Sequence, residues 1–508
     1  MSNPNPLEPV ARAPRWFVWL GVLALAAFAL FLARNTSVAA AGSDSSGYLN
    51  SGRLLAAGHW QTALRTPPEF GPQMELNRAH FTPHGFFPQP GNPHLPPTYP
   101  PGLPLHYALA GKILGWEIGP LVVGLAGALG ALWLCYATAR ELGLDPWLAA
   151  AGASALGACP VFLFTSIQPL SDTLATAWAL ATFYTALRAR RHSGWAAACG
   201  AATAVAVLVR PTNLVMLPAL VVLLGLDWRR LGLATLAGLP GAVWVALYNR
   251  ELYGGPMRSG YGDWQAAFSW SYAPPTLAHF AHWLPLLLPG VLVALALAAT
   301  VRRDFRTRGL LALGLWFAAV VGLYACYEVS REAWWCLRFI LPGIPALILA
   351  GLLGADAVVR SFAIQRAQRW RAIAAVILGL WAVGGSCYWT KKLGVLYTKG
   401  YEEAYAKACV AARGQLPANA LVTCFYLSGA IYHYTDFAVL RWDQIEAAQF
   451  ARYAALAQTS GRPVCAVIFG MEEQGALRER CPGNWTKIGT SNQISFWRLD
   501  GLNATSAK

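Results

Sequence analysis

A series of long apolar runs dominates this chain of 508 residues. Each run approaches the length of about 20 residues that a helix needs to cross the hydrocarbon core of a bilayer. Backbone polar groups in lipid must be bonded within their own segment, so runs of this kind form helices. The sequence therefore predicts a polytopic α-helical membrane protein. The runs lie at about 16–34, 117–139, 147–166, 172–189, 231–249, 281–301, 309–327, 338–355 and 370–390.

Composition and charge support this class and exclude others. Only 12% of the residues are charged and 56% are hydrophobic, whereas a soluble domain carries about 25% charged residues. The net charge of +15 would suit nucleic acid, but the basic residues gather in short turns between apolar runs, as the positive-inside rule describes. We therefore expect no nucleic-acid partner. The clusters are Arg188, Arg190 and Arg191; Arg229 and Arg230; Arg302, Arg303, Arg306 and Arg308; and Arg360, Arg366, Arg369 and Arg371.

Two further stretches are ambiguous as membrane spans, and the arginine clusters decide the second. Residues 194–226 are interrupted at Arg210-Pro211, which predicts two short spans that form a hairpin. The run 101–115 begins with proline, contains Lys112 and is too short to span. With a cytoplasmic N-terminus, all the arginine clusters fall inside only if 101–115 does not cross the membrane. It is therefore predicted to be re-entrant or interfacial, which gives about eleven spans and places the C-terminal segment outside.

The predicted topology divides the chain into a transmembrane module, 1–394, and an extramembrane domain, 395–508. Three segments then share the outer face: a long loop from 35 to 116, a loop from 250 to 280, and the C-terminal domain. That domain is predicted to be a small α/β fold. Its predicted elements are a helix at 404–413 and strands at 420–426, 463–469 and 494–499.

Four cysteines lie in this C-terminal segment. In an oxidising compartment such thiols tend to be bridged, and the sequence favours a Cys465–Cys481 bond, which closes a loop of about 15 residues. A bond between Cys409 and Cys424 is the second possibility. Four buried free thiols are the third, since cysteines in strands often pack as small hydrophobic residues.

Two carboxylates are candidates for catalysis. Asp44 follows the first span, within a segment to Trp60 that predicts an amphipathic helix on the outer leaflet. Asp172 lies between two later spans and is predicted to face the same side. Either aspartate has an alternative role as the N-cap of the helix that follows it. Ionisable groups at a membrane edge nevertheless tend to mark functional sites.

Several cations are candidates for binding phosphate, because guanidinium groups match phosphate geometry. The alternative is that they reach lipid head groups or pair with nearby acids. These residues are Arg210, Arg258 and Arg338, with Lys112. The histidines His80, His84 and His94 are spaced irregularly in a proline-rich loop, which favours an ordinary polar loop over a metal site. No cofactor is therefore expected, and a divalent metal is not supported.

The order of these motifs resembles that of the GT-C glycosyltransferases, which include protein O-mannosyltransferases and the lipid A aminoarabinose transferase. The resemblance covers about residues 15–250, with weaker similarity at Arg338-Phe339 and Leu341-Pro342. It implies a polyprenyl-phosphate sugar donor, a base at Asp44 and a second acidic site residue at Asp172. The mannosyltransferases carry Asp-Glu in the first loop, whereas here Ser45 follows Asp44, which puts a protein acceptor in doubt. The motifs are Asp44 with Tyr48, the stretch from His94 through Tyr99 to Gly102, Ser171-Asp172, and Arg210-Pro211.

The predicted activity is that of a hexosyl- or pentosyltransferase. It moves a sugar to the hydroxyl of a lipid, glycan or protein acceptor, with inversion at the anomeric carbon. Tyr48, His94 and Tyr99 are predicted to bind substrate, and a bacterial inner membrane is the predicted location. The main alternative is a lipid or sugar transporter or flippase. Transporters commonly contain two related halves, and this sequence shows none. A non-catalytic assembly protein is a further alternative.

Overall fold

The computed structural model describes residues 14–71, 76–288, 290–301, 308–362 and 367–502. The basic residues Arg302, Arg303, Arg306 and Arg366 lie outside the described residues. The chain forms two compact units. Unit 1 comprises Met1–Thr36, Leu121–Val245 and Asp263–Thr398, and unit 2 comprises Ser37–Pro120, Ala246–Gly262 and Lys399–Lys508.

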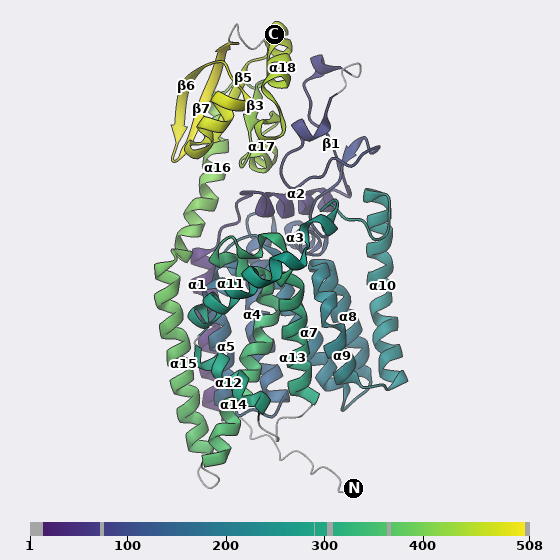
Figure 1. The fold of residues 1–508 in the computed structure, drawn as a ribbon, viewed down its shortest axis with the longest axis vertical. Coiled ribbons are helices and arrows are strands. Elements are labelled where there is room, and N and C mark those ends of the chain that lie inside the picture. Colours follow the sequence, from purple (N-terminus) through teal and green to yellow (C-terminus); the bar gives the residue numbers. More distant parts are fainter. Residues whose placement is uncertain (1–13, 72–75, 289, 302–307, 363–366, 503–508) are drawn as a thin grey trace. The chain divides into compact units, whose positions relative to one another are not determined.

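Unit 1 is built from α-helices (Figure 1). Six helices are long and apolar enough to cross a membrane, or seven if one bent pair is included, among the described residues. This confirms the predicted helical membrane class, whereas the count of about eleven spans stays a prediction. The helices are α1 (Arg15–Asn35), α4 (Gly119–Glu141), α5 (Pro146–Ala158), α6 (Pro160–Ser166), α7 (Ser171–Ala189), α8 (Gly194–Val209), α9 (Leu217–Leu224), α10 (Trp228–Tyr253, which continues into unit 2 from Ala246), α11 (Ala273–Leu287), α12 (Gly290–Val301), α13 (Arg308–Ala325), α14 (Ile344–Phe362) and α15 (Ala367–Lys392).

Prolines break three of the predicted apolar runs. Arg210 is extended before Pro211, with φ −150°, so the predicted interruption of 194–226 is confirmed. The predicted apolar runs 147–166 and 281–301 are each divided into two helices. Helices α5 and α6 meet at Cys159 with a bend of 61°, and α11 ends before an extended Leu288. In each case the next residue in sequence is proline, which disfavours the helical conformation of the residue before it.

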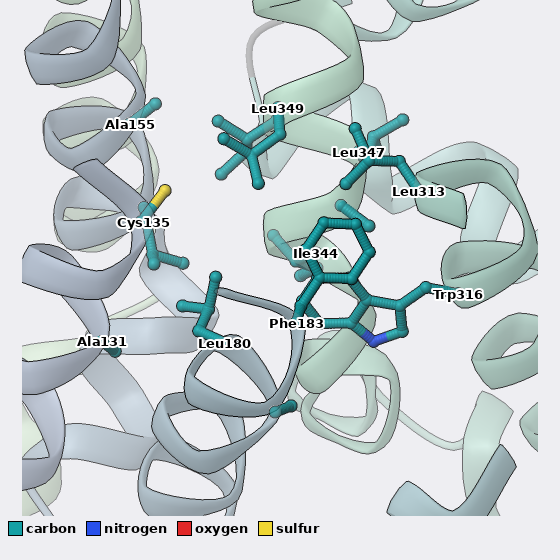
Figure 2. Packing of buried hydrophobic residues seen from close by; sticks show 14 of the residues in the cluster. Ala131, Cys135, Ala155, Leu180, Phe183, Leu313, Trp316, Ile344, Leu347 and Leu349 are labelled. Carbon is teal, nitrogen blue, oxygen red and sulfur yellow. The ribbon is translucent and has the colours of Figure 1, made fainter. Parts of the chain in front are cut away.

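The core of unit 1 combines small residues with a few large rings. Figure 2 shows Ala131 and Cys135 of α4 facing the same interior as Leu180 and Phe183 of α7. The ring of Phe183 stacks on Trp316 of α13 with the centroids 5.0 Å apart. Small residues let helix backbones approach closely without lipid between them. The stacked rings therefore join α7 to α13, and the small side chains of α4 belong to the same core.

Unit 2 contains a mixed sheet and the elements around it. The strand order is β4-β3-β5-β7-β6, in which β4, β3 and β5 are parallel and the last two strands are antiparallel. In Figure 1 this sheet lies toward the yellow end of the chain, and α16 leads into it. The elements are α2 (Asp44–Ala56), β1 (Thr62–Ala63), β2 (His94–Leu95), α3 (Gly102–Leu114), α16 (Thr398–Gln415), β3 (Leu421–Cys424), α17 (Ser428–Tyr434), β4 (Ala438–Arg441), α18 (Ala447–Thr459), β5 (Val464–Phe469), β6 (Asn484–Ser491) and β7 (Ile494–Gly501).

The helix and the three strands predicted in the C-terminal segment correspond to α16, β3, β5 and β7, and their existence is confirmed. Unit 2 also gathers the greater part of the three segments that were predicted to share the outer face. The compact unit 2 thus groups residues 399–508 with 37–120 and 246–262. The predicted division instead assigns 37–120 and 246–262 to the transmembrane module. The division into 1–394 and 395–508 by membrane location stays a prediction.

The predicted Cys465–Cys481 bond was wrong, because all ten cysteines are free thiols. Alternate residues of β5 point to opposite faces of the sheet. Cys465 packs on one face, in the apolar cluster that holds Cys409 and Cys424. Cys481 packs in a different cluster, which holds Phe450 and Leu499. The two thiols are therefore buried as small apolar groups in separate cores.

The helix predicted after Asp44 is present as α2, and its position on the outer leaflet stays a prediction. Every residue from Ser45 to Gly52 is buried, and α2 packs against α3 and α17. The first two turns of α2 are thus interior structure. Helix α3 has 13 residues. Its re-entrant or interfacial position in the membrane stays a prediction.

Candidate active site

The first candidate carboxylate lies at the start of α2. Ser43 occupies the N-cap position without a side-chain capping bond, and Asp44 is the first helical residue. A carboxylate in the first turn is favoured by the helix dipole and the unpaired N–H groups there. Asp44 is therefore not the N-cap of α2. It lies one residue further along, at the first helical position. Its carboxylate takes part in a side-chain contact instead.

That contact is with Tyr99, from the loop before α3. The Tyr99 hydroxyl donates a hydrogen bond of 2.6 Å to Oδ1 of Asp44 and lies 2.7 Å from Oγ of Ser43. Its ring packs against Tyr48, with the centroids 4.8 Å apart. Burial, and then the charge of Asp44, raise the pKa of Tyr99 well above 10. The hydroxyl therefore stays protonated and holds the carboxylate in one orientation.

Two glycines allow the loop to approach α2 so closely. A Cβ atom on Gly47 would lie 2.4 Å from Cε2 of Tyr99, and one on Gly85 would lie 2.3 Å from Cα of Gly47. Gly85 also has φ +89°, a conformation that favours glycine. The backbone N–H of Thr98 donates to the Gly85 carbonyl at 2.8 Å. These contacts set the position of Tyr99 over the first turns of α2.

A second carboxyl group approaches α2 from the C-terminal segment. Oγ of Ser45 donates a hydrogen bond of 2.9 Å to Oε2 of Glu402, which lies on α16. Burial, followed by the negative charge of Asp44, raises the pKa of Glu402 to about 7. Sequence reasoning missed Glu402, because helix α16 carries it among several other charged residues and no motif marks it.

A buried histidine lies at the carboxyl ends of the parallel strands. His84 packs edge-on against Phe425, 4.9 Å between centroids, and its backbone N–H donates to Ser428 Oγ at 3.1 Å. Burial, and then the charge of Arg441, lower the pKa of His84 to about 3. Arg441 in turn donates two hydrogen bonds of 2.6 Å to the carboxylate of Asp443. His84 is therefore neutral at pH 7, and its Nδ1 atom is buried without a hydrogen-bond partner among the described residues.

The other two predicted histidines lie elsewhere in unit 2. Nδ1 of His80 is 3.0 Å from the hydroxyl of Tyr453, and His94 is exposed in β2. Among the residues that the structure describes, no group of three His, Cys, Asp or Glu side chains is arranged to hold a metal ion. His80 thus has a hydrogen-bond partner within the protein.

The second candidate carboxylate belongs to unit 1. Leu170 is the N-cap of α7, so Asp172 lies within the first turn, and its buried carboxylate forms an ion pair with Arg210. Nε of Arg210 also donates to the Tyr324 hydroxyl at 3.0 Å. The guanidinium groups of Arg210 and Arg338 lie 5.6 and 5.2 Å from the centroid of the Phe339 ring. The structure therefore brings together three predicted site residues: Asp172, Arg210 and Arg338.

The remaining predicted residues are exposed on three different elements of unit 2. Lys112 lies in the last turn of α3 and Arg258 lies in the loop after α10. Tyr261, three residues after Arg258, packs edge-on against Tyr99 at 6.0 Å. His94 lines a hollow of about 360 Å³ together with Gly58, His59, Trp60, Gln61, Glu251 and Leu252. The loop that carries Arg258 is thus tied to the ring that holds Asp44.

Part of the chain is similar in sequence to a known protein family. Residues 96–248 match the sequence family described as dolichyl-phosphate-mannose-protein mannosyltransferase. No curated protein matches the chain in sequence. The matched region includes Tyr99, Asp172 and Arg210 but neither Asp44 nor Glu402.

Solved structures resemble the chain over nearly its whole length. ArnT from Cupriavidus metallidurans bound to undecaprenyl phosphate is 17% identical, with a TM-score of 0.59 over 98% of this chain and 100% of that one. The oligosaccharyltransferase of Archaeoglobus fulgidus is 13% identical, with a TM-score of 0.57 over 91% of this chain and 70% of that one. The arabinofuranosyltransferase AftD from Mycobacteria is 13% identical, with a TM-score of 0.53 over 97% and 40%. The chain has the GT-C fold of these membrane glycosyltransferases.

Proposed function

We propose that this chain is a membrane glycosyltransferase that moves a sugar from a polyprenyl-phosphate-linked donor to an acceptor hydroxyl, with Asp44 as the general base. The observation that carries the proposal is the 2.6 Å bond from the Tyr99 hydroxyl to Asp44, in a chain with the GT-C fold. A half-buried carboxylate held by a protonated tyrosine is suited to take a proton from a bound hydroxyl.

The proposed reaction needs only a few groups from the protein. The lipid phosphate is already an anionic leaving group, so no general acid is required. The acceptor O–H bond breaks and its proton passes to Asp44, while the oxygen forms a bond to the anomeric carbon. The bond from that carbon to the phosphate oxygen breaks, and its electron pair leaves with the polyprenyl phosphate. Direct displacement of this kind inverts the anomeric centre.

The cations are proposed to hold the departing phosphate. Arg210 and Arg338 flank the Phe339 ring in unit 1, where guanidinium groups match phosphate geometry. Asp172 orients Arg210 through their ion pair, which is our proposal for its part in catalysis. Exposed Arg258 and Lys112, which belong to unit 2, stay proposals for binding the donor phosphate. Tyr48 and His94 stay proposals for substrate binding.

The proposed location is the inner membrane of a bacterium, with unit 2 outside the cytoplasm. Asp436 and Arg190 are both exposed and test this orientation. In a background without native cysteines, a cysteine replacing Asp436 is expected to react with an impermeant thiol reagent added outside intact cells. A cysteine replacing Arg190 is expected to react only after the membrane is opened. The reverse pattern would contradict the proposed orientation.

Transfer itself is tested with purified protein in lipid nanodiscs and radiolabelled polyprenyl-phosphate sugars. The expected result is loss of the sugar from the lipid, either to an added acceptor or slowly to water. The same protein in sealed vesicles tests the transporter alternative. Uptake of an intact labelled lipid that depends on sidedness, without cleavage from the phosphate, would favour a transporter and contradict the proposed function.

A further inference from the structure

The hollow of about 360 Å³ on unit 2 has the size of a ligand site, since small-molecule sites in proteins occupy about 300–1,000 Å³. Three segments form its wall. The turn after α2 contributes His59, Trp60 and Gln61, strand β2 contributes His94, and the last turn of α10 contributes Glu251. All three segments belong to unit 2, so the hollow is formed within one compact unit.

Local structure fixes the polar groups on one side of the hollow. Gly58, with φ +80°, turns the chain after α2. Nδ2 of Asn92 donates a hydrogen bond of 2.8 Å to Oε1 of Gln61. Oδ1 of Asn92 accepts a bond of 2.9 Å from the backbone N–H of His94, and β1 pairs Ala63 with His94. The amide and the imidazole are therefore held on neighbouring strands.

Trp60 gives the hollow an aromatic surface. Its side chain is 41% exposed, and its ring packs against the buried Tyr248 of α10, with the centroids 5.7 Å apart. Glu251 lies three residues after Tyr248, and residues at this spacing are neighbours on a helix surface. Helix α10 thus supports the indole and also brings a carboxylate to the hollow.

The chemistry of these groups suits an uncharged sugar. The apolar C–H face of a sugar ring can pack on an indole, while its hydroxyls bond to carboxylate, amide and imidazole groups. Neither arginine nor lysine is among the described residues that line the hollow, unlike a site for phosphate. A cation would also suit the indole and the carboxylate, but it would leave the amide and the two imidazoles unused.

We propose that this hollow binds a neutral sugar of the acceptor, with Trp60 as the stacking surface and with Glu251 and His94 bonded to its hydroxyls. The assignment to the acceptor rests on the proposed function. Helix α2 has 13 residues, so about 20 Å separate its two ends at 1.5 Å per residue. Asp44 lies at one end and the hollow follows the other. The acceptor is therefore an extended glycan, part of which binds far from the reacting hydroxyl.

Binding is tested separately from transfer, with fluorescently labelled protein in lipid nanodiscs on an array of printed oligosaccharides. The array carries neutral, anionic and amino-sugar chains of increasing length. The wild type is expected to be retained on neutral chains, and Trp60→Ala to bind them about 30-fold more weakly. Trp60→Tyr keeps a stacking ring and is expected to restore most of the affinity. Tyr401→Ala, which removes an exposed ring of the same unit, is the matched control and is expected to bind normally.

A second variant tests the carboxylate without changing the packing of a ring. Glu251 is exposed, and Glu251→Gln is expected to weaken retention on neutral chains by about 5-fold, because an amide accepts a hydrogen bond less strongly than a carboxylate. Glu479→Gln changes another exposed carboxylate of unit 2 and is expected to have no effect. This pair decides the inference if Trp60→Ala fails to fold, as judged by thermal unfolding in detergent.

Transfer kinetics then test the assignment to the acceptor. With the retained glycan as acceptor, Trp60→Ala is expected to raise its KM by about 30-fold, while kcat and the KM for the donor stay unchanged. An unchanged KM in this variant overturns the assignment to the acceptor. If the wild type binds the glycan through Trp60 but transfers no sugar to any acceptor, the proposed function falls while the sugar site stands.

The inference itself falls on any of three results of the binding test. The first is that the wild type is not retained on neutral chains, and the second is that Trp60→Ala and Glu251→Gln bind them as the wild type does. The third is retention on amino-sugar chains alone, which would identify a site for a cation. Each of these results is independent of whether the protein transfers sugar.

Discussion

The hydroxyl of Tyr99 donates a 2.6 Å hydrogen bond to Oδ1 of Asp44, and this bond joins the start of α2 to the loop before α3. Hydrogen bonds to charged groups contribute about 1.5–3 kcal/mol. Their effect on a reaction depends on how well they hold the reacting group in place. The contact therefore connects a local packing feature of unit 2 to the proposed chemistry.

Asp44→Asn keeps the size of the side chain but removes its ability to accept a proton. Transfer is expected to fall by about 100-fold or more, measured as release of labelled sugar from its lipid carrier. Binding of the donor, measured separately, is expected to remain. The matched control is Asp436→Asn, which changes an exposed carboxylate of the same unit. Near-normal turnover by Asp44→Asn would remove this residue from the mechanism.

Tyr99→Phe deletes one hydroxyl and leaves the ring that packs on Tyr48. Loss of a hydrogen bond to a charged group is expected to lower kcat by about 10-fold, with little change in KM for the donor. Tyr401→Phe, at an exposed position of α16, is the control and is expected to leave kcat unchanged. Equal kcat values for Tyr99→Phe and the wild type would show that the hydroxyl does not orient the base.

Gly47→Ala tests the close approach between α2 and its loop. The added Cβ would lie 2.4 Å from the Tyr99 ring and 2.9 Å from Cα of Gly85. Overpacking of this kind destabilises by about 1–3 kcal/mol, which lowers the midpoint of thermal unfolding in detergent. Gly414→Ala on α16 has no atom within 4 Å of its Cβ, so it is expected to stabilise by about 0.5–1 kcal/mol. Changes of the same sign in both variants would contradict this interpretation.

Variants of the ion pair between Asp172 and Arg210 distinguish a structural role of Arg210 from a role in donor binding. Removing either partner alone leaves a buried charge and is expected to cost about 3–5 kcal/mol of unfolding free energy. The double variant Asp172→Leu, Arg210→Met is expected to recover most of that stability. If Arg210 binds the donor phosphate, the double variant folds but binds the donor weakly. Donor binding at the wild-type level in the folded double variant would contradict the assignment.

The raised pKa of Glu402 predicts a pH dependence of stability. Its pKa is about 7 in the folded protein against an ordinary value of 4.5. The folded state therefore binds more protons than the unfolded state between these values, and the contribution of this group falls as the pH rises through about 7. Glu402→Gln is expected to lose this dependence, so that its thermal midpoint gains relative to the wild type between pH 5 and about 8. Parallel curves for the two proteins would contradict the shift.

The sequence predicted those features that depend on local pattern. Asp44 and Tyr99 could be chosen from the order of short motifs, and Asp172 with Arg210 from charge at the ends of apolar runs. The bend at Cys159 was missed although Pro160 was visible, because an apolar run is counted by hydropathy and not by backbone conformation. Strand β6 was missed because its residues are mostly polar, whereas the apolar residues Ile494, Phe496 and Leu499 mark β7.

Contacts between distant segments were beyond such reasoning. The sequence shows that Ser45 stands where protein O-mannosyltransferases carry glutamate. It does not show that Glu402 brings a carboxyl group to Ser45 from α16. The buried position of His84 against Phe425 is similar, since only the folded sheet places the end of β3 beside that loop. One-dimensional patterns do not contain these pairings.

The assembly of unit 2 from three separated segments has a consequence for biosynthesis. Asp44 leaves the ribosome early, but the helix that carries Glu402 and the strands beside His84 follow more than 300 residues later. Throughout insertion into the membrane, the surroundings of Asp44 are therefore incomplete. Unit 2 becomes complete only when translation is nearly finished.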